Sequence, residues 1–154
     1  MIREAVEYQP AETDQWTMDG LSLLTAMIGS EVFGTATRGQ ADAFFGAVGR
    51  RIASLLQVAD ISDGDALMAR INRLWRTLGW GEAQLRMTDD AIMIQHGGLP
   101  ETLQGDVDGR WADMAPPLLR GAYDAWFRAL GGGADLHTSV LQWRDGIMEI
   151  RHGG

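Results

Sequence analysis

Three histidines are the first candidates for chemistry in this chain, because imidazole is a common zinc ligand in proteins. His96, His137 and His152 lie far apart, and no pair has the H-x-x-x-H spacing that places two rings on one helical face. The chain also contains no cysteine, which excludes thiolate metal sites and disulfides. We therefore expect structural or solvated histidines, no bound metal and no other cofactor.

The aspartates and glycines can also be explained without catalysis. Asp106 and Asp108 precede Gly109 as in part of a calcium loop, but the third oxygen-bearing position and the terminal Glu are absent. No serine stands in a G-x-S-x-G turn, and no glycine run has the lysine and spacing of a phosphate-binding loop. Four aspartates could supply the acid and base of a glycosidase, yet their places indicate helix caps and turns: Asp63, Asp65, Asp89 and Asp90. We predict no catalytic residue and no enzyme activity.

Length and composition favour one domain with its own hydrophobic core, since the chain has 154 residues and 45% apolar content. We expect an N-terminal arm at 1–12, which has no periodic apolar stripe, and a single domain at 13–154. The sequence shows neither a hydrophobic signal region nor an apolar run of about 18 residues. The expected location is the cytoplasm, including the cytoplasmic side of the inner membrane, and the periplasm stays open as an alternative. A net charge of -8 opposes nucleic-acid binding.

Helical periodicity places three helices before any strand. Thr13 can cap a first helix that runs to about residue 28, followed by a Gly/Thr-rich break at 29–39. Thr37 and Gln40 form a capping-box pair before the second helix, and Ser62 starts a third that ends at Gly79. The expected apolar positions recur at three- and four-residue intervals: Trp16, Leu21, Leu24, Met27 and Ile28; Ala41, Phe44, Phe45, Val48, Ile52, Leu55 and Leu56; Leu67, Met68, Ile71, Leu74, Trp75 and Leu78.

A hairpin and a fourth helix follow. Alternating apolar residues from Ala83 to Met87, and then a polar turn at 88–90, predict the hairpin. Asp113 can cap the helix, with two prolines in its first turn, where their missing N–H groups remove few hydrogen bonds, and glycines at its end: Pro116, Pro117, Gly131, Gly132 and Gly133.

The last hairpin has the most specific local signal, because Asp145-Gly146 suits the left-handed dihedrals of a two-residue turn. This turn places Trp143 opposite Met148, and Leu141 opposite Ile150, on one face. The predicted fold is a single α+β domain with the order three helices, hairpin, helix, hairpin. Its antiparallel four-stranded sheet has helices on its apolar face.

Small residues and tryptophans suggest contact surfaces. Gly46 and Gly49 each cost about 1 kcal/mol of helix propensity relative to alanine, which is understandable if another backbone approaches closely there. With Arg50, they are candidates for a helix-packing or oligomer contact. The six tryptophans could stack on sugar rings, but three lie on expected apolar faces, which favours core packing: Trp75, Trp126 and Trp143.

Three segments in a fixed order carry a family resemblance. They are W-G-x-x-x-L from Trp80, A-(apolar)-x-I-x-H-x-x-L-P from Ala91, and P-(apolar)-L-x-G-x-Y-x-x-W from Pro117. Their order and spacing resemble the D-subunit family of bacterial cellulose synthase, as does V-G-R-R-I-A at 48–53. The loop at 101–114 is longer than in the family pattern, and Trp111 has no clear counterpart there. The motif residues that we expect to have a structural role are Trp80, Gly81, His96, Leu99, Pro100, Pro117, Gly121, Tyr123 and Trp126.

The resemblance implies a non-catalytic accessory subunit of the cellulose synthase complex. Such a protein is expected to form a ring-like homo-octamer that guides nascent β-1,4-glucan chains toward export and crystalline bundling, together with other synthase subunits. The family's architecture implies that the N-terminal arms face the passage, and the implied glucan contacts are Ile2, Arg3, Glu4, Val6, Glu7 and Tyr8.

Two other function classes stay open. The order of helices and hairpins also resembles small-ligand domains of the heme–nitric-oxide and vesicle-tethering type, which would make the chain a sensor or adaptor. A buried ligand with a dedicated anchor would distinguish that class, yet none of the three histidines lies on an expected helix. A scaffold that binds only proteins is the third reading.

Overall fold

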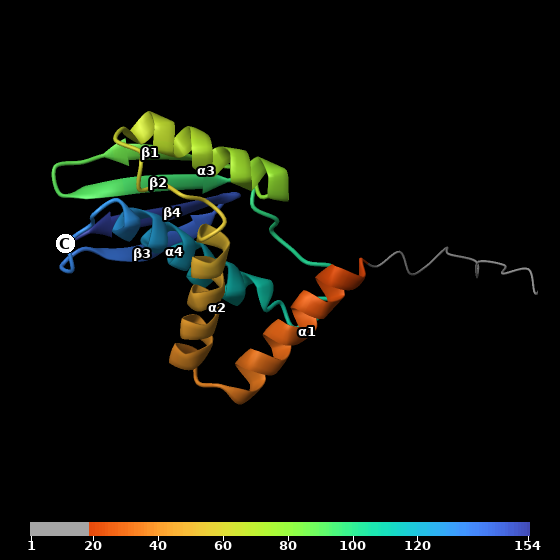
Figure 1. Ribbon diagram of the computed structural model, residues 1–154. Helices are drawn as coiled ribbons and strands as arrows, with labels where there is room; N and C mark the ends of the chain where they lie inside the picture. The colour runs from red at the N-terminus through yellow and green to blue at the C-terminus, as the bar shows by residue number, and fades with distance from the viewer. Residues whose placement is uncertain (1–18) are drawn as a thin grey trace, which may run out of the picture.

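A computed structural model describes residues 19–154, which form a four-stranded antiparallel sheet with helices against one face (Figure 1). The α+β class and the predicted order of three helices, hairpin, helix and hairpin are confirmed. The expected arm at 1–12, Thr13 and Trp16 lie outside the described residues. The elements are α1 (Gly20–Thr35), α2 (Arg38–Ala53), α3 (Gly64–Leu78), β1 (Glu82–Met87), β2 (Ala91–Gly97), α4 (Trp111–Ala129), β3 (His137–Arg144) and β4 (Ile147–Gly153).

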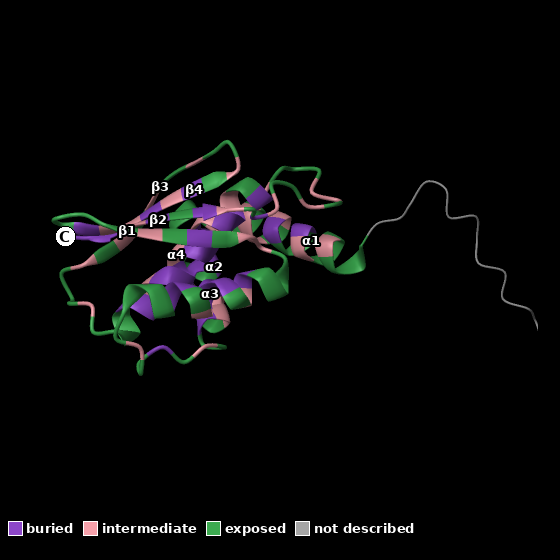
Figure 2. Ribbon diagram, turned by 90° about the horizontal axis from the view of Figure 1, so that it is seen from above, coloured by how far each residue is buried: buried purple, intermediate pink, exposed green. Residues whose placement is uncertain are grey.

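The sheet has the strand order β1-β2-β4-β3, so the two hairpins meet along β2 and β4. Alternate residues of these central strands point to opposite faces, as the pleat requires. His96, Ile94, Met148 and Ile150 are fully buried under the helices, whereas Gln95 on the other face is exposed. Figure 2 shows the buried residues concentrated between the sheet and α4.

The last hairpin turns at Asp145-Gly146 as predicted, with φ of 54° and 75°. Trp143 pairs with Met148, but the predicted pairing of Leu141 with Ile150 is wrong. Val140 takes that place, because a bulge between Val140 and Gln142 leaves Leu141 without a partner. Leu141 is accordingly 51% exposed.

The starts of α2 and α3 follow local capping rules. The Thr37–Gln40 capping box is confirmed, with both reciprocal hydrogen bonds present. The third helix is capped by Asp63 and not by Ser62, because the Asp63 carboxylate accepts from the Ala66 N–H at 2.8 Å. Gly79 ends α3 in the predicted left-handed conformation, with φ of 70°.

The first helix differs most from the prediction. It begins at Gly20 after an Asp19 cap and continues to Thr35, through part of the expected break at 29–39. Gly29 does not interrupt it, because this glycine is buried against Met114, whose sulfur fills the space that a Cβ would need. The buried side of α1 is therefore its small-residue side, Ala26 and Gly29, and its apolar stripe faces outward.

The fourth helix begins at Trp111, two residues before the predicted Asp113 cap. Asp106 provides the physical reason, since its two carboxylate oxygens accept from the backbone N–H groups of Arg110 and Trp111 at 2.8 and 2.9 Å. The earlier start moves Pro116 and the proline after it from the first turn into the second.

Candidate functional site

An aromatic cluster fills the space between α3, α4 and β2. Trp75 of α3 is fully buried at its centre and stacks on Trp80, with ring centroids 5.8 Å apart and planes 16° apart. Trp126 of α4 meets Trp75 edge to face at 5.5 Å, and Tyr123 meets Trp126 in the same manner at 5.5 Å. His96 of β2 completes the cluster at 5.2 Å from Trp75.

The polar atoms of this cluster form one continuous hydrogen-bonded relay. The Trp75 indole N–H donates to the Tyr123 hydroxyl oxygen at 3.0 Å. His96 Nε2 lies 2.7 Å from the Trp80 carbonyl, which can only accept, so Nε2 carries the proton. His96 Nδ1 is then the acceptor for the Tyr123 O–H at 2.7 Å. Every polar atom of the three side chains therefore has a partner, and the relay fixes the neutral tautomer of His96.

Burial controls the ionisation of this relay. It lowers the pKa of His96, against the opposing effect of the hydrogen bond to the Trp80 carbonyl. Burial also raises the pKa of Tyr123 far above its ordinary value, and the hydrogen bond from Trp75 only partly offsets this. Both groups stay uncharged at neutral pH, as suits a polar network inside a core and not an acid–base pair.

The family-motif glycines allow close backbone contacts. Gly121 of α4 lies against the Gly46 carbonyl of α2, and a Cβ at Gly49 would overlap the Leu118 carbonyl. These two helices thus meet at backbone distance within one protomer, while the Arg50 side chain stays exposed. Side chains of ordinary size would force the helices apart.

A second set of motif residues holds the segments that enter and leave the hairpin. Gly81 has φ of 80°, and a Cβ there would overlap the Gly97 carbonyl, so no other residue fits. Leu99 is buried, and the Pro100 carbonyl accepts from the Trp111 indole N–H. Trp111, the first residue of α4, is buried and contacts Trp80, so it packs the start of this helix against the entry to the hairpin.

A family model for the D subunit of cellulose synthase matches residues 13–153 of the 154. The chain belongs to this family. Its role is therefore that of an accessory component in cellulose synthesis, alongside the other synthase subunits. No curated protein sequence matches the chain.

Family motifs that are separate in the sequence thus converge around one cluster: Trp80, Gly81, His96, Leu99, Pro100, Tyr123 and Trp126 around the relay, and Pro117 and Gly121 at the helix crossing. The implied glucan contacts from Ile2 to Tyr8 lie outside the described residues. Within 19–154 every tryptophan is buried or half-buried, and the half-buried ones are Trp80 and Trp143. The same part of the chain contains no cluster of three potential metal ligands and no helix able to span a membrane.

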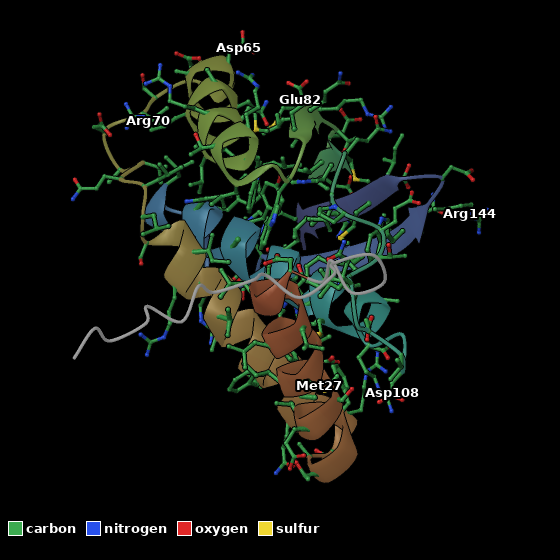
Figure 3. The ribbon with its side chains drawn as sticks, turned by 90° about the vertical axis from the view of Figure 1, so that its right-hand side faces the viewer. Met27, Asp65, Arg70, Glu82, Asp108 and Arg144 are labelled. Atoms are coloured by element: carbon green, nitrogen blue, oxygen red, sulfur yellow. The ribbon has the colours of Figure 1, made fainter. Side chains whose placement is uncertain are left out.

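One surface of this cellulose synthase component was not predicted as a surface. Helix α1 lies away from the sheet (Figure 1), and Figure 3 looks onto this helix with Met27 labelled. Its apolar stripe is exposed. Its exposed fractions are high for apolar side chains: Leu21 75%, Leu24 56%, Met27 42% and Ile28 43%. The periodicity identified these residues correctly as one side of a helix, but it could not tell an inward stripe from an outward one.

The buried position of His152 was not predicted from the sequence. His152 on β4 is only 2% exposed and connects through Thr138 to Asp124 of α4. The available signal was the alternation Met148, Ile150, His152, which places all three on the inward face.

Proposed function

We propose that this cellulose synthase component assembles into a ring-like homo-octamer that guides nascent β-1,4-glucan chains toward export and crystalline bundling, without catalysing a reaction. The exposed stripe of α1 is the structural observation that carries the proposal. Contiguous apolar patches on a folded domain mark interaction surfaces. Leu21, Leu24 and Ile28 are helical neighbours, so they form one such patch.

The low charge of α1 makes this helix a surface along which two copies of the chain can meet. The protein carries a net charge of -8, which makes most contacts between copies repulsive. Helix α1 contains only one charged residue, Glu31, so copies can meet along it with little repulsion. Closed symmetry is the common outcome when identical protomers associate, and a ring satisfies this requirement.

The glucan path in this proposal uses the segment that precedes α1 in the sequence. Ile2, Arg3, Glu4, Val6, Glu7 and Tyr8 are the proposed contacts. A polymer that moves through a passage needs weak and repeated contacts, and this short segment mixes apolar, charged and aromatic side chains that can supply them.

Light scattering of the purified chain tests the assembly. We expect one species near eight protomers for the natural sequence and a smaller species for the double variant Leu24→Ser/Ile28→Ser. The matched control is Leu55→Ser, since Leu55 is an exposed leucine (67%) near the end of α2 and should leave the mass unchanged. A double variant that keeps the full mass would refute α1 as the contact, and a monomeric natural chain would refute the ring.

A further inference from the structure

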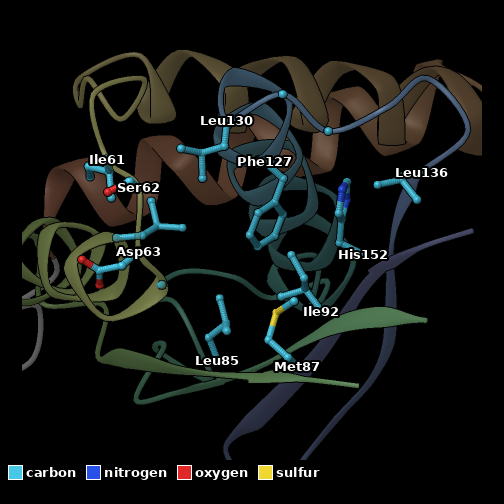
Figure 4. A pocket seen from close by; sticks show the side chains of 14 residues that line it. Ile61, Ser62, Asp63, Leu85, Met87, Ile92, Phe127, Leu130, Leu136 and His152 are labelled. Carbon is cyan, nitrogen blue, oxygen red and sulfur yellow. The ribbon is translucent and has the colours of Figure 1, made fainter. Parts of the chain in front are cut away.

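A cavity of about 590 Å³ opens between the start of α3, the β1–β2 hairpin and the loop that follows α4 (Figure 4). This volume falls in the range of small-molecule sites. Its walls are mainly apolar and include Leu67, Leu85, Met87, Ile92, Phe127 and Leu130. A molecule held there would contact mostly apolar carbon.

His152 lines this cavity and has an unsatisfied acceptor. Thr138 donates its hydroxyl proton to Asp124 at 2.8 Å, so its oxygen accepts from His152 Nδ1 at 2.8 Å. The proton of neutral His152 therefore lies on Nδ1, which leaves a lone pair on Nε2. Nε2 is buried and has no hydrogen-bond partner in the described part of the chain. A buried polar atom in this state is rare in folded proteins.

The loop beside Nε2 is built from glycine. A Cβ at Gly132 would lie 3.3 Å from Nε2, so the missing side chain preserves space next to the lone pair. His152 is held in place by its ring contact with Phe127, with centroids 4.8 Å apart, and by the bond to Thr138. The His152 ring is thus held in place where it lines the apolar cavity, with Nε2 on the side of Gly132.

The charges around the cavity select against an anion. The Asp124 carboxylate lies behind His152, through Thr138, and Asp63 lines the cavity at the start of α3. Burial lowers the pKa of His152, although the charge of Asp124 opposes this, while Arg128 and His137 lower it further. The neutral ring offers an acceptor, and the positive charge of Arg128 is already paired with the Asp124 carboxylate at 2.7 Å.

We propose that this cavity binds an uncharged amphiphile, with an aliphatic chain against the apolar walls and one hydroxyl that donates to His152 Nε2. A glucan chain does not suit the cavity, because its many hydroxyl groups would meet apolar walls. The proposal is independent of the assembly through α1 and of the glucan path.

Decanol and decanoate are matched probes, since they share the chain length and differ in the head group. We expect decanol to bind the full-length protein at least tenfold more tightly than decanoate at pH 7.5, measured by NMR on histidine labelled with ¹⁵N. Decanol should also shift the Nε2 resonance of His152, because a new hydrogen bond to this nitrogen changes its shielding. Equal affinities, no binding of decanol, or an unmoved Nε2 resonance would overturn the proposal.

Two alanine variants locate the site. Gly132→Ala places a methyl group beside Nε2 and should weaken decanol binding tenfold or more, whereas Gly133→Ala has open space around it and should change nothing. Since the new methyl also lies 3.0 Å from the Phe127 carbonyl, the fold of Gly132→Ala is checked by its urea midpoint. If that variant unfolds, His152→Asn, which can keep the bond to Thr138 but lacks the outer acceptor, takes its place. Unchanged decanol binding in the folded variant would contradict the assignment.

Discussion

Removing one oxygen atom from the aromatic relay should destabilise the whole domain. In Tyr123→Phe the ring keeps its place between Trp75, Trp126 and Phe127, so the apolar packing changes little. Two hydrogen bonds disappear, the one from the Trp75 indole N–H and the one to His96 Nδ1. Trp75 and His96 are each 0% exposed, so water cannot replace the missing partner.

The cost of this change follows from the two groups left unpaired. Each buried and unsatisfied polar group costs about 1–3 kcal/mol, so we expect the free energy of unfolding to fall by about 3 kcal/mol. This is a large part of the roughly 5–15 kcal/mol that stabilises a typical domain. Urea unfolding followed by tryptophan fluorescence measures it, and the slope m should stay constant because the surface exposed on unfolding is unchanged.

Ser30→Ala is the matched control for the loss of a single hydroxyl. The half-buried Ser30 of α1 donates its hydroxyl proton to the Asp108 carboxylate at 2.8 Å in a solvent-exposed hydrogen bond, where water can replace either partner. We expect this control to change the unfolding free energy by less than about 0.5 kcal/mol. If Tyr123→Phe costs no more than Ser30→Ala, the relay does not stabilise the core in the way described.

Three further predictions follow from the packing, the buried histidines and the N-terminal arm. Gly49→Ala should cost about 1–3 kcal/mol because its Cβ meets a backbone carbonyl of α4. Gly39→Ala, in open space on the same helix, should be neutral or stabilising, and equal urea midpoints would contradict the close helix contact. Stability should fall as pH drops below the ordinary histidine value of 6.5, because burial lowers the pKa of His96 and His152 and the unfolded chain takes up protons first. A urea midpoint that is constant from pH 7.5 to 5 would show that neither histidine contributes. Deletion of residues 1–12 should preserve the oligomer mass but weaken cello-oligosaccharide binding in titration, whereas disassembly would make this segment a structural contact.

Local rules predicted the parts of the fold that local chemistry decides. The capping box of α2, the left-handed Gly79 and the Asp145-Gly146 turn each depend on a few adjacent residues, and each occurs where the sequence indicated. The start of α4 depends on Asp106, which lies before the helix, and the length of α1 depends on Met114 from another element. Asp106 lies five residues before Trp111, outside the usual capping position, and Met114 is distant in sequence from α1, so the standard capping rules placed neither end.

In the candidate site too, single residues could be predicted from the sequence, whereas their contacts across elements could not. The family motifs identified Trp80, His96 and Tyr123 individually, but no spacing in the sequence indicates that they share one hydrogen-bonded relay with Trp75. Only the folded arrangement of three elements brings these residues together. The outward direction of the α1 stripe was equally hidden, because a helical period does not say which side of the helix the rest of the domain covers.

Cellulose crystallinity in living cells tests the central claim most directly. In a cellulose-producing cell that lacks its own copy of this synthase component, X-ray diffraction would compare the cellulose made with the natural chain, with Leu24→Ser/Ile28→Ser and with Leu55→Ser. We expect the natural chain and Leu55→Ser to restore the crystalline fraction, and the α1 double variant to leave it low at equal protein level. Full restoration by the double variant would contradict a guide that works through assembly along α1.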